Sequence, residues 1–175
     1  VFFVLAALLY RQEITDWFKF LSYKPSPAIV QLADDSGMSQ SGKFYFYITD
    51  PKLESASNFN KDCRRSESIN PVLGCYVGGS DKIYIYDIDN ADLQGVEEVT
   101  AAHEMLHAAY FRLSNDERDR IGKLLDKEYE RIKTPELEKR MSYYEKEEPG
   151  GQAVELFAIL PTEFSDIGSE LDTYY

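Results

Sequence analysis

Uncharged and mostly apolar residues occupy the first ten positions of the chain, VFFVLAALLY, and charged residues enter only after them. Ten residues are too few to cross a bilayer as a helix, yet a run without a polar face is untypical of a helix packed on a globular domain. Tyr10, Trp17 and Phe18 are aromatic residues of the kind found at membrane–water boundaries. We therefore expect residues 1–22 to be a truncated transmembrane or signal-anchor helix. An amphipathic helix packed on the domain is the alternative.

A Pro/Ser-rich stretch, residues 23–28, follows and predicts a linker, since proline restricts the preceding residue to extended geometry. The folded domain would then cover residues 29–175. Within it, KFYFYITD (43–50) and KIYIYDID (82–89) are rich in β-branched and aromatic residues, so both predict strands. The residues between these two predicted strands indicate irregular structure.

From about residue 96 the apolar residues recur with a helical period. The segment 95–113 has two glutamates in its first turn, where the helix dipole favours negative charge. Ser114 followed by Glu117 forms a capping box that opens the next helix. Three more helices are expected at 135–144, at 153–160 up to Pro161, and after Gly168. The order of elements predicts an α+β fold in which a small twisted sheet packs on the 95–113 helix and the C-terminal part is helical.

The charge balance narrows the choice of partners. The chain has 31 acidic and 19 basic residues, which gives a formal net charge of −12. Phosphate binding needs a positive field, so this charge argues against a nucleic-acid partner. A hydrophobic content of 43% over 175 residues fits one folded domain rather than a disordered chain.

The only two cysteines, Cys63 and Cys75, enclose a loop that contains Asn70-Pro71 and Gly74. This arrangement predicts a disulfide, which would contribute about 3 kcal/mol at this loop length. Two free buried thiols are the alternative, and zinc ligation is disfavoured because the spacing is not C-x₂₋₄-C. A disulfide next to a membrane anchor would place the domain outside the cytoplasm.

Both histidines of the chain lie in TAAHEMLHAA (100–109), four positions apart, and apart from Glu104 the residues around them are uncharged. On a helix His103 and His107 project from the same face, so their imidazoles can converge on one ion. Glu104 is rotated by about 100° from His103, which places its carboxylate beside the ion rather than on it. There it could take a proton from a zinc-bound water. The alternatives are two hydrogen-bonded histidines on a core helix and a purely structural zinc site.

The segment 100–109 resembles the active-site helix of the zincin metallopeptidases, in which two histidines bind zinc and the glutamate is the general base. In the metzincin branch a glycine and a third histidine would stand where this chain has Tyr110 and Leu113. That branch is therefore excluded. The gluzincin branch, which takes its third zinc ligand from a glutamate on a second, downstream helix, is the closer resemblance.

Glu155 is the best candidate for this third ligand. It is the only ionisable residue in AVELFAIL (153–160), and a buried carboxylate is tolerated when it coordinates a metal. VELFA also resembles the glutamate helix of gluzincins. Glu163 is the second candidate. Where gluzincins often carry a supporting carboxylate four residues after the ligand, this chain has Ile159, and Thr162 or Glu163 could substitute.

The resemblance also implies two features of the substrate cleft. Several gluzincin-like families place a tyrosine upstream of the glutamate to stabilise the oxyanion, so Tyr143 and Tyr144 are candidates, with ordinary packing as the alternative. The strand at 82–89 precedes the site helix, as the cleft-edge strand of zincins does, and would pair with an extended peptide. Core packing of its Tyr and Ile residues is the alternative.

Together these features predict a membrane-anchored, extracytoplasmic zinc metallopeptidase of gluzincin-like type. It would hydrolyse a peptide or protein substrate with Zn²⁺ as cofactor and Glu104 as general base. Two alternatives stay open. One is a non-catalytic zinc-binding interaction module at the cell surface. The presence of Glu104 disfavours this alternative, because a scaffold has no use for a carboxylate at that position. The other is a zinc hydrolase of a non-peptide amide such as a cell-wall crosslink.

Overall fold

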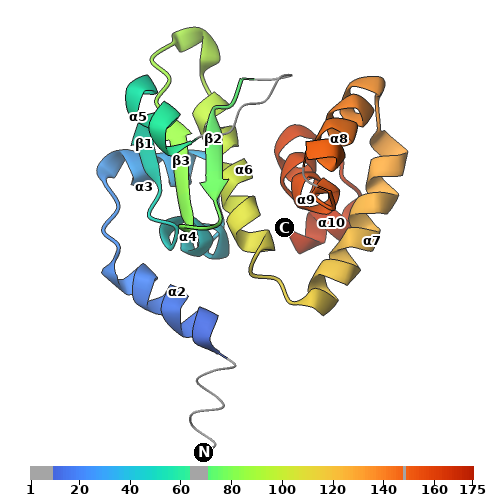
Figure 1. The fold of residues 1–175 in the computed structure, drawn as a ribbon, viewed down its shortest axis with the longest axis horizontal. Coiled ribbons are helices and arrows are strands. Elements are labelled where there is room, and N and C mark those ends of the chain that lie inside the picture. The colour runs from blue at the N-terminus through green and yellow to red at the C-terminus, as the bar shows by residue number, and fades with distance from the viewer. Residues whose placement is uncertain (1–9, 64–70, 148) are drawn as a thin grey trace, which may run out of the picture.

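A computed structural model describes residues 10–63, 71–147 and 149–175 of the chain. The fold is α+β, as the sequence predicts: one small sheet and many helices (Figure 1). In chain order the elements are α2 (Arg11–Ser22), α3 (Pro27–Asp35), α4 (Gln40–Tyr47), β1 (Lys52–Glu54), α5 (Ala56–Asp62), β2 (Gly74–Val77), β3 (Lys82–Tyr86), η1 (Ala91–Leu93), α6 (Val96–Tyr110), α7 (Asn115–Ile132), α8 (Pro135–Glu147), α9 (Gln152–Glu163) and α10 (Ser169–Tyr174).

Helix α6 divides the molecule into two parts (Figure 1). The sheet with α3, α4 and α5 lies on one side of it, and α7 to α10 lie on the other. Both parts pack on α6, and for this reason its second half is buried almost all round, from Glu104 to Tyr110. The core runs through both parts and includes Ile83 and Ile85 of the sheet and Leu156 of α9.

The sheet has three strands in the order β1-β3-β2. β1 pairs in parallel with β3, and β2 pairs with it antiparallel. The strand predicted at 82–89 is confirmed as β3, but it occupies the centre of the sheet, so the expectation that it forms the edge of a cleft is wrong. The edge strand in contact with α6 is β2, in a segment that was expected to be irregular.

The prediction of a strand at 43–50 is also wrong, because residues 43–47 belong to helix α4 and residues 48–50 follow its end. The helix begins after Ser39, whose hydroxyl accepts a hydrogen bond from the backbone N–H of Gly42 at 3.1 Å. Phe46 is completely buried on the face that α4 presents to the core. A short aromatic run fits a strand or a buried helix equally well, and here the N-cap and the tertiary packing decide.

Helix α9 continues through Pro161, where the sequence predicted its end. Proline cannot donate a backbone hydrogen bond, so the carbonyl of Phe157 loses its usual helical partner. The hydroxyl of Tyr175 donates to this carbonyl at 2.8 Å and replaces the missing bond. The predicted capping box of Ser114 and Glu117 is confirmed at the start of α7.

The predicted disulfide is confirmed. Cys63 and Cys75 are bonded, with their Cα atoms 5.9 Å apart, and the bond joins the end of α5 to β2. Such a bond is compatible with an oxidising compartment outside the cytoplasm.

Helix α2 is attached to the rest of the molecule by one aromatic contact and a cluster of ion pairs. The rings of Phe20 and Phe44 lie 5.2 Å apart, which seats α2 against α4. The guanidinium of Arg112 pairs with Asp16 and with Asp81, each at 2.7 Å, and Lys19 also pairs with Asp81. None of the helices in the described part of the chain has the length and apolar character needed to span a bilayer. Most of the apolar stretch at 1–10 lies outside the described residues.

Candidate metal centre

The two histidines of α6 face each other at one point of its surface. The distance between His103 Nε2 and His107 Nε2 is 3.1 Å, and the two rings are nearly perpendicular. His107 is buried, whereas His103 is partly exposed. The one-turn spacing in the sequence therefore has the predicted consequence, since both imidazoles lie on the same face.

Glu155 reaches the same point from α9, which packs along α6. Its carboxylate oxygens lie 4.0 Å from His103 Nε2 and 3.9 Å from His107 Nε2. The side chain is only 4% exposed and stands in the first turn of α9. There the positive end of the helix dipole favours a negative charge, which lowers the free-energy cost of burying an ionised carboxylate.

These three side chains fit a metal ion. Zinc binds imidazole nitrogen and carboxylate oxygen at about 2.0–2.2 Å, so two ligands of one ion lie at most about 4.4 Å apart. His103 Nε2 and His107 Nε2 lie 3.1 Å apart, and they lie 4.0 and 3.9 Å from two different oxygens of Glu155. With one donor atom from each residue, the three atoms lie within 4.8 Å of one another, which is close to the spacing that one ion requires. The 3.1 Å contact alone would also suit a hydrogen bond between the two rings. The carboxylate oxygens of Glu155 lie beyond the usual hydrogen-bond range of about 2.7–3.2 Å from the imidazole nitrogens, at distances that suit an ion pair or ligands of a shared ion.

Among the described residues, His103, His107 and Glu155 form a group that could hold a metal ion. The donor set suits Zn²⁺, and imidazole nitrogen also binds copper, iron and nickel. Glu163, the second candidate, is not part of this group: it lines the neighbouring cavity, and its carboxylate pairs with Arg140 Nη2 at 2.8 Å.

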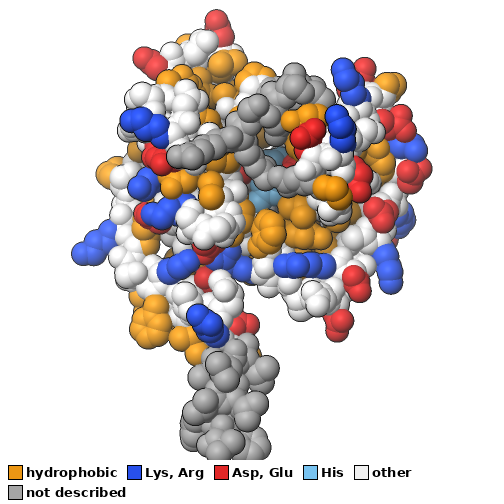
Figure 2. All heavy atoms as spheres, in the orientation of Figure 1, with side chains coloured by type: hydrophobic (Ala, Val, Ile, Leu, Met, Phe, Trp, Pro, Cys, Tyr) orange, Lys and Arg blue, Asp and Glu red, His pale blue; other side chains and the backbone are white. Residues whose placement is uncertain are grey.

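A cavity of about 180 Å³ opens beside this group. Its lining includes His103, Glu104 and Tyr144, together with the residues that lead into β2. Figure 2 shows the histidines at the bottom of a hollow between the two parts of the molecule. Of the two candidate tyrosines, Tyr144 lines this cavity and Tyr143 is not part of the lining.

Glu104 is buried against β2, where Gly74 leaves room for it. A Cβ atom at Gly74 would lie 2.9 Å from Glu104 Cγ, 3.0 Å from Glu104 Oε1 and 2.5 Å from Thr100 Cγ2. The glycine thus permits the close approach that places the Glu104 carboxylate at the cavity. In the sequence Gly74 is only a loop residue next to Cys75, and nothing near it in the chain indicates its contact with α6.

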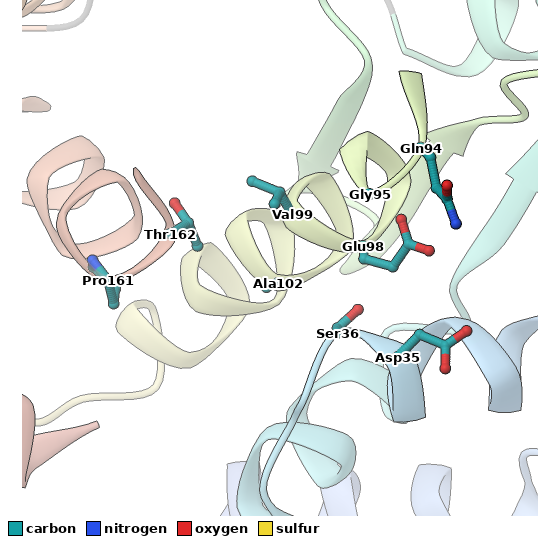
Figure 3. Close-up of a pocket in the computed structure, with 9 residues that line it drawn as sticks. All are labelled: Asp35, Ser36, Gln94, Gly95, Glu98, Val99, Ala102, Pro161 and Thr162. Atoms are coloured by element: carbon teal, nitrogen blue, oxygen red, sulfur yellow. The ribbon is translucent and has the colours of Figure 1, made fainter. Parts of the chain in front are cut away.

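A second, larger cavity of about 750 Å³ lies next to the first (Figure 3). Val99 of α6 and Thr162 of α9 line both cavities, so the two cavities are adjacent. Asp35 and Ser36 at the end of α3 stand across from Glu98 of α6. The group of His103, His107 and Glu155 therefore lies beside a larger concave surface.

Comparison with known proteins does not identify a family for this chain. No family model matches the chain, and no curated protein or solved structure is significantly similar to it. Any functional assignment therefore rests on the site.

Proposed function

We propose that this protein is a zinc-dependent metallopeptidase of gluzincin-like type, with a zincin-like fold. The observation that carries the proposal is the convergence of His103 and His107 on α6 with Glu155 on α9. Glu104, the neighbour of His103 on the same helix, lines the cavity at this point. A structural metal site needs three or four ligands but no acid–base group, and Glu104 supplies that group next to the ligands.

Each residue of the site has a defined role in the proposal. His103, His107 and Glu155 would hold the zinc ion. When bound, zinc supplies Lewis-acid polarisation of the scissile carbonyl and lowers the pKa of water. The Glu104 carboxylate accepts a proton from the attacking water and delivers it to the leaving amine. Tyr144, whose side chain borders the same cavity, donates a hydrogen bond to the developing oxyanion.

The surroundings of the site support a peptide substrate. β2 is an edge strand, and an edge strand can pair with an extended peptide backbone. The residues that enter β2, from Pro71 to Gly74, line the cavity that contains His103 and Glu104. A peptide laid along this edge would thus pass the proposed zinc site, and the larger cavity would receive its continuation.

We also propose that the domain works outside the cytoplasm, tethered to a membrane through its N-terminal segment. The disulfide between Cys63 and Cys75 supports the compartment. The uncharged sequence at positions 1–10 supports the tether.

The proposal is tested by measuring metal content and peptide hydrolysis in the same preparations. We expect about one zinc ion per chain by mass spectrometry, lost in the His103→Ala/His107→Ala variant. Glu104→Gln should keep the zinc and lower kcat by about 10²–10⁴-fold against a peptide library. Glu130→Gln, an exposed residue of α7, is the matched control and should change neither quantity.

Two outcomes would contradict the proposal. Absence of zinc after reconstitution would remove the metal site. A zinc-loaded parent chain that behaves identically to its Glu104→Gln variant in every hydrolytic assay would favour a non-catalytic interaction module. Hydrolysis of non-peptide amides alone would keep the residue roles and change the substrate class.

A further inference from the structure

Helix α2 carries its apolar residues on the side that faces solvent. Ile14, Trp17, Phe18 and Leu21 are 44, 55, 66 and 61% exposed, and Tyr10 just before the helix is 60% exposed. At about 100° per residue these five positions share one stripe, which we call the α2 apolar face. A helix on the surface of a globular protein normally shows the opposite arrangement, with its apolar stripe on the core.

The opposite side of α2 is fixed to the domain by buried charges. Asp16 is only 3% exposed, and both of its oxygens accept hydrogen bonds from Arg112, at 2.7 and 3.1 Å. Arg112 follows the C-terminus of α6 and also donates to the Ala108 carbonyl of that helix. Rotating α2 to bury its apolar face would break these bonds and leave charges buried without partners, which is strongly unfavourable. The outward orientation of the face is therefore a fixed property of the fold.

The chemistry of the α2 apolar face fits a lipid surface. Tryptophan, tyrosine and phenylalanine are the residues that bury in the boundary between headgroups and acyl chains. In the sequence the face continues directly into the uncharged, mostly apolar run of positions 1–9. A second copy of the chain is a poorer occupant, because a stable protein interface needs about 20–30 residues from each side and this face offers five.

We propose that the α2 apolar face lies in the surface of a lipid bilayer and that the Asp16–Arg112 pair fixes the domain, and with it helix α6, at a set angle to the membrane. The proposal deepens the membrane location proposed above and rests on it. It does not depend on zinc or on hydrolysis. Because the face has no charge, the bilayer need not be anionic.

Trp17 is the only tryptophan of the chain, so its fluorescence reports on this face alone. The chain of residues 1–175 would be mixed with phosphatidylcholine vesicles, and binding would be followed by flotation while acrylamide quenching of Trp17 is recorded. We expect the chain to float with the vesicles, the emission to shift to the blue, and quenching by acrylamide to fall severalfold. Brominated phosphatidylcholine should in turn quench Trp17.

Two variants separate the α2 apolar face from the preceding segment. Phe18→Gln/Leu21→Gln leaves positions 1–9 unchanged, so flotation should persist while Trp17 regains most of its access to acrylamide. Val30→Gln/Leu93→Gln removes two exposed apolar side chains elsewhere and should behave like the parent chain. Circular dichroism of each variant checks that the fold is retained.

Three results would overturn the proposal. A chain that does not float lacks the membrane location itself. A chain that floats while Trp17 stays open to acrylamide has a membrane tether but no lipid contact at α2. A blue shift that needs no vesicles and grows with protein concentration shows a second copy on this face. All three are independent of whether the protein hydrolyses peptides.

Discussion

At the scale of single residues, the third ligand distinguishes the proposed site from a pair of neighbouring histidines. Glu155→Ala should lower zinc affinity by about 100-fold or more, since even residues that only support a ligand contribute about 10–100-fold. Glu163→Gln is the matched control and should leave the affinity unchanged, because Glu163 pairs with Arg140. Competition with a chromophoric chelator measures both affinities. If only the Glu163→Gln variant lost zinc, Glu163 rather than Glu155 would be the third ligand.

Gly74 provides a second test at this scale. Gly74→Ala forces a Cβ atom against Thr100 and Glu104, so we expect a loss of about 1–3 kcal/mol in the free energy of unfolding. Displacement of the Glu104 carboxylate should also lower kcat more than it lowers zinc affinity. Gly79→Ala is the control, since its Cβ atom meets nothing within 4 Å. Urea unfolding measures both variants, and equal losses in the two would refute the steric argument.

The sequence predicted those site residues that can be recognised from the pattern of a single helix. His103 and His107 share a face by spacing alone, and Glu155 stands out as the single charge in an apolar run. Gly74 could not be found in this way, because its role arises only when β2 packs on α6. The choice between Tyr143 and Tyr144 likewise depends on how α8 is rotated toward the cavity, which the sequence around two adjacent tyrosines does not determine.

At the scale of elements, helix α9 continues through a proline because a residue distant in the sequence replaces the lost hydrogen bond. Tyr175 donates a hydrogen bond to the Phe157 carbonyl, the acceptor that Pro161 leaves without its helical partner. Tyr175→Phe should therefore lower the free energy of unfolding by about 1–3 kcal/mol. In a Pro161→Ala background the alanine N–H can bond Phe157, so the same substitution should cost clearly less. A double-mutant cycle by urea unfolding measures the difference, and additive effects would contradict the explanation.

Helix α4 shows why a short aromatic segment was predicted as the wrong type of element. Its aromatic residues have strand propensity, whereas the hydroxyl of Ser39 caps the start of a helix. Propensity is a weak preference that burial overrides, and here the complete burial of Phe46 favours the helix. The α7 capping box was predicted correctly because two local hydrogen bonds, and no tertiary contact, define it.

At the scale of the whole molecule, the site exists only because two parts pack on opposite sides of α6. The sequence predicts an α+β fold with a C-terminal helical part, but not which strand forms the edge or how α9 lies against α6. Those depend on long-range packing. Asp81 is a further long-range junction, since its carboxylate receives hydrogen bonds from Lys19 of α2, Tyr76 of β2 and Arg112 after α6.

This junction predicts how the protein responds to acid. Burial would raise the pKa of Asp81, but the hydrogen bonds from Arg112, Lys19 and Tyr76 outweigh it and hold the pKa below its ordinary value of 3.8. A carboxyl group whose pKa is lower in the folded state stabilises the fold above its ordinary pKa, and this contribution is lost as the pH falls through the folded value. The net charge of −12 acts in the opposite direction, because protonation of surface carboxylates relieves repulsion.

Asp81→Asn separates the two effects, since it removes one titrating group and leaves the other acidic residues in place. At neutral pH the variant should be less stable by about 1.5–3 kcal/mol, the usual contribution of hydrogen bonds to a charged group. Below about pH 4 the difference between the parent and the variant should shrink, because protonated Asp81 no longer attracts Arg112 and Lys19. Urea unfolding of both chains from about pH 7 to about pH 3 measures the difference. A difference that stays constant across this range would show that Asp81 stabilises the fold by packing rather than by its charge.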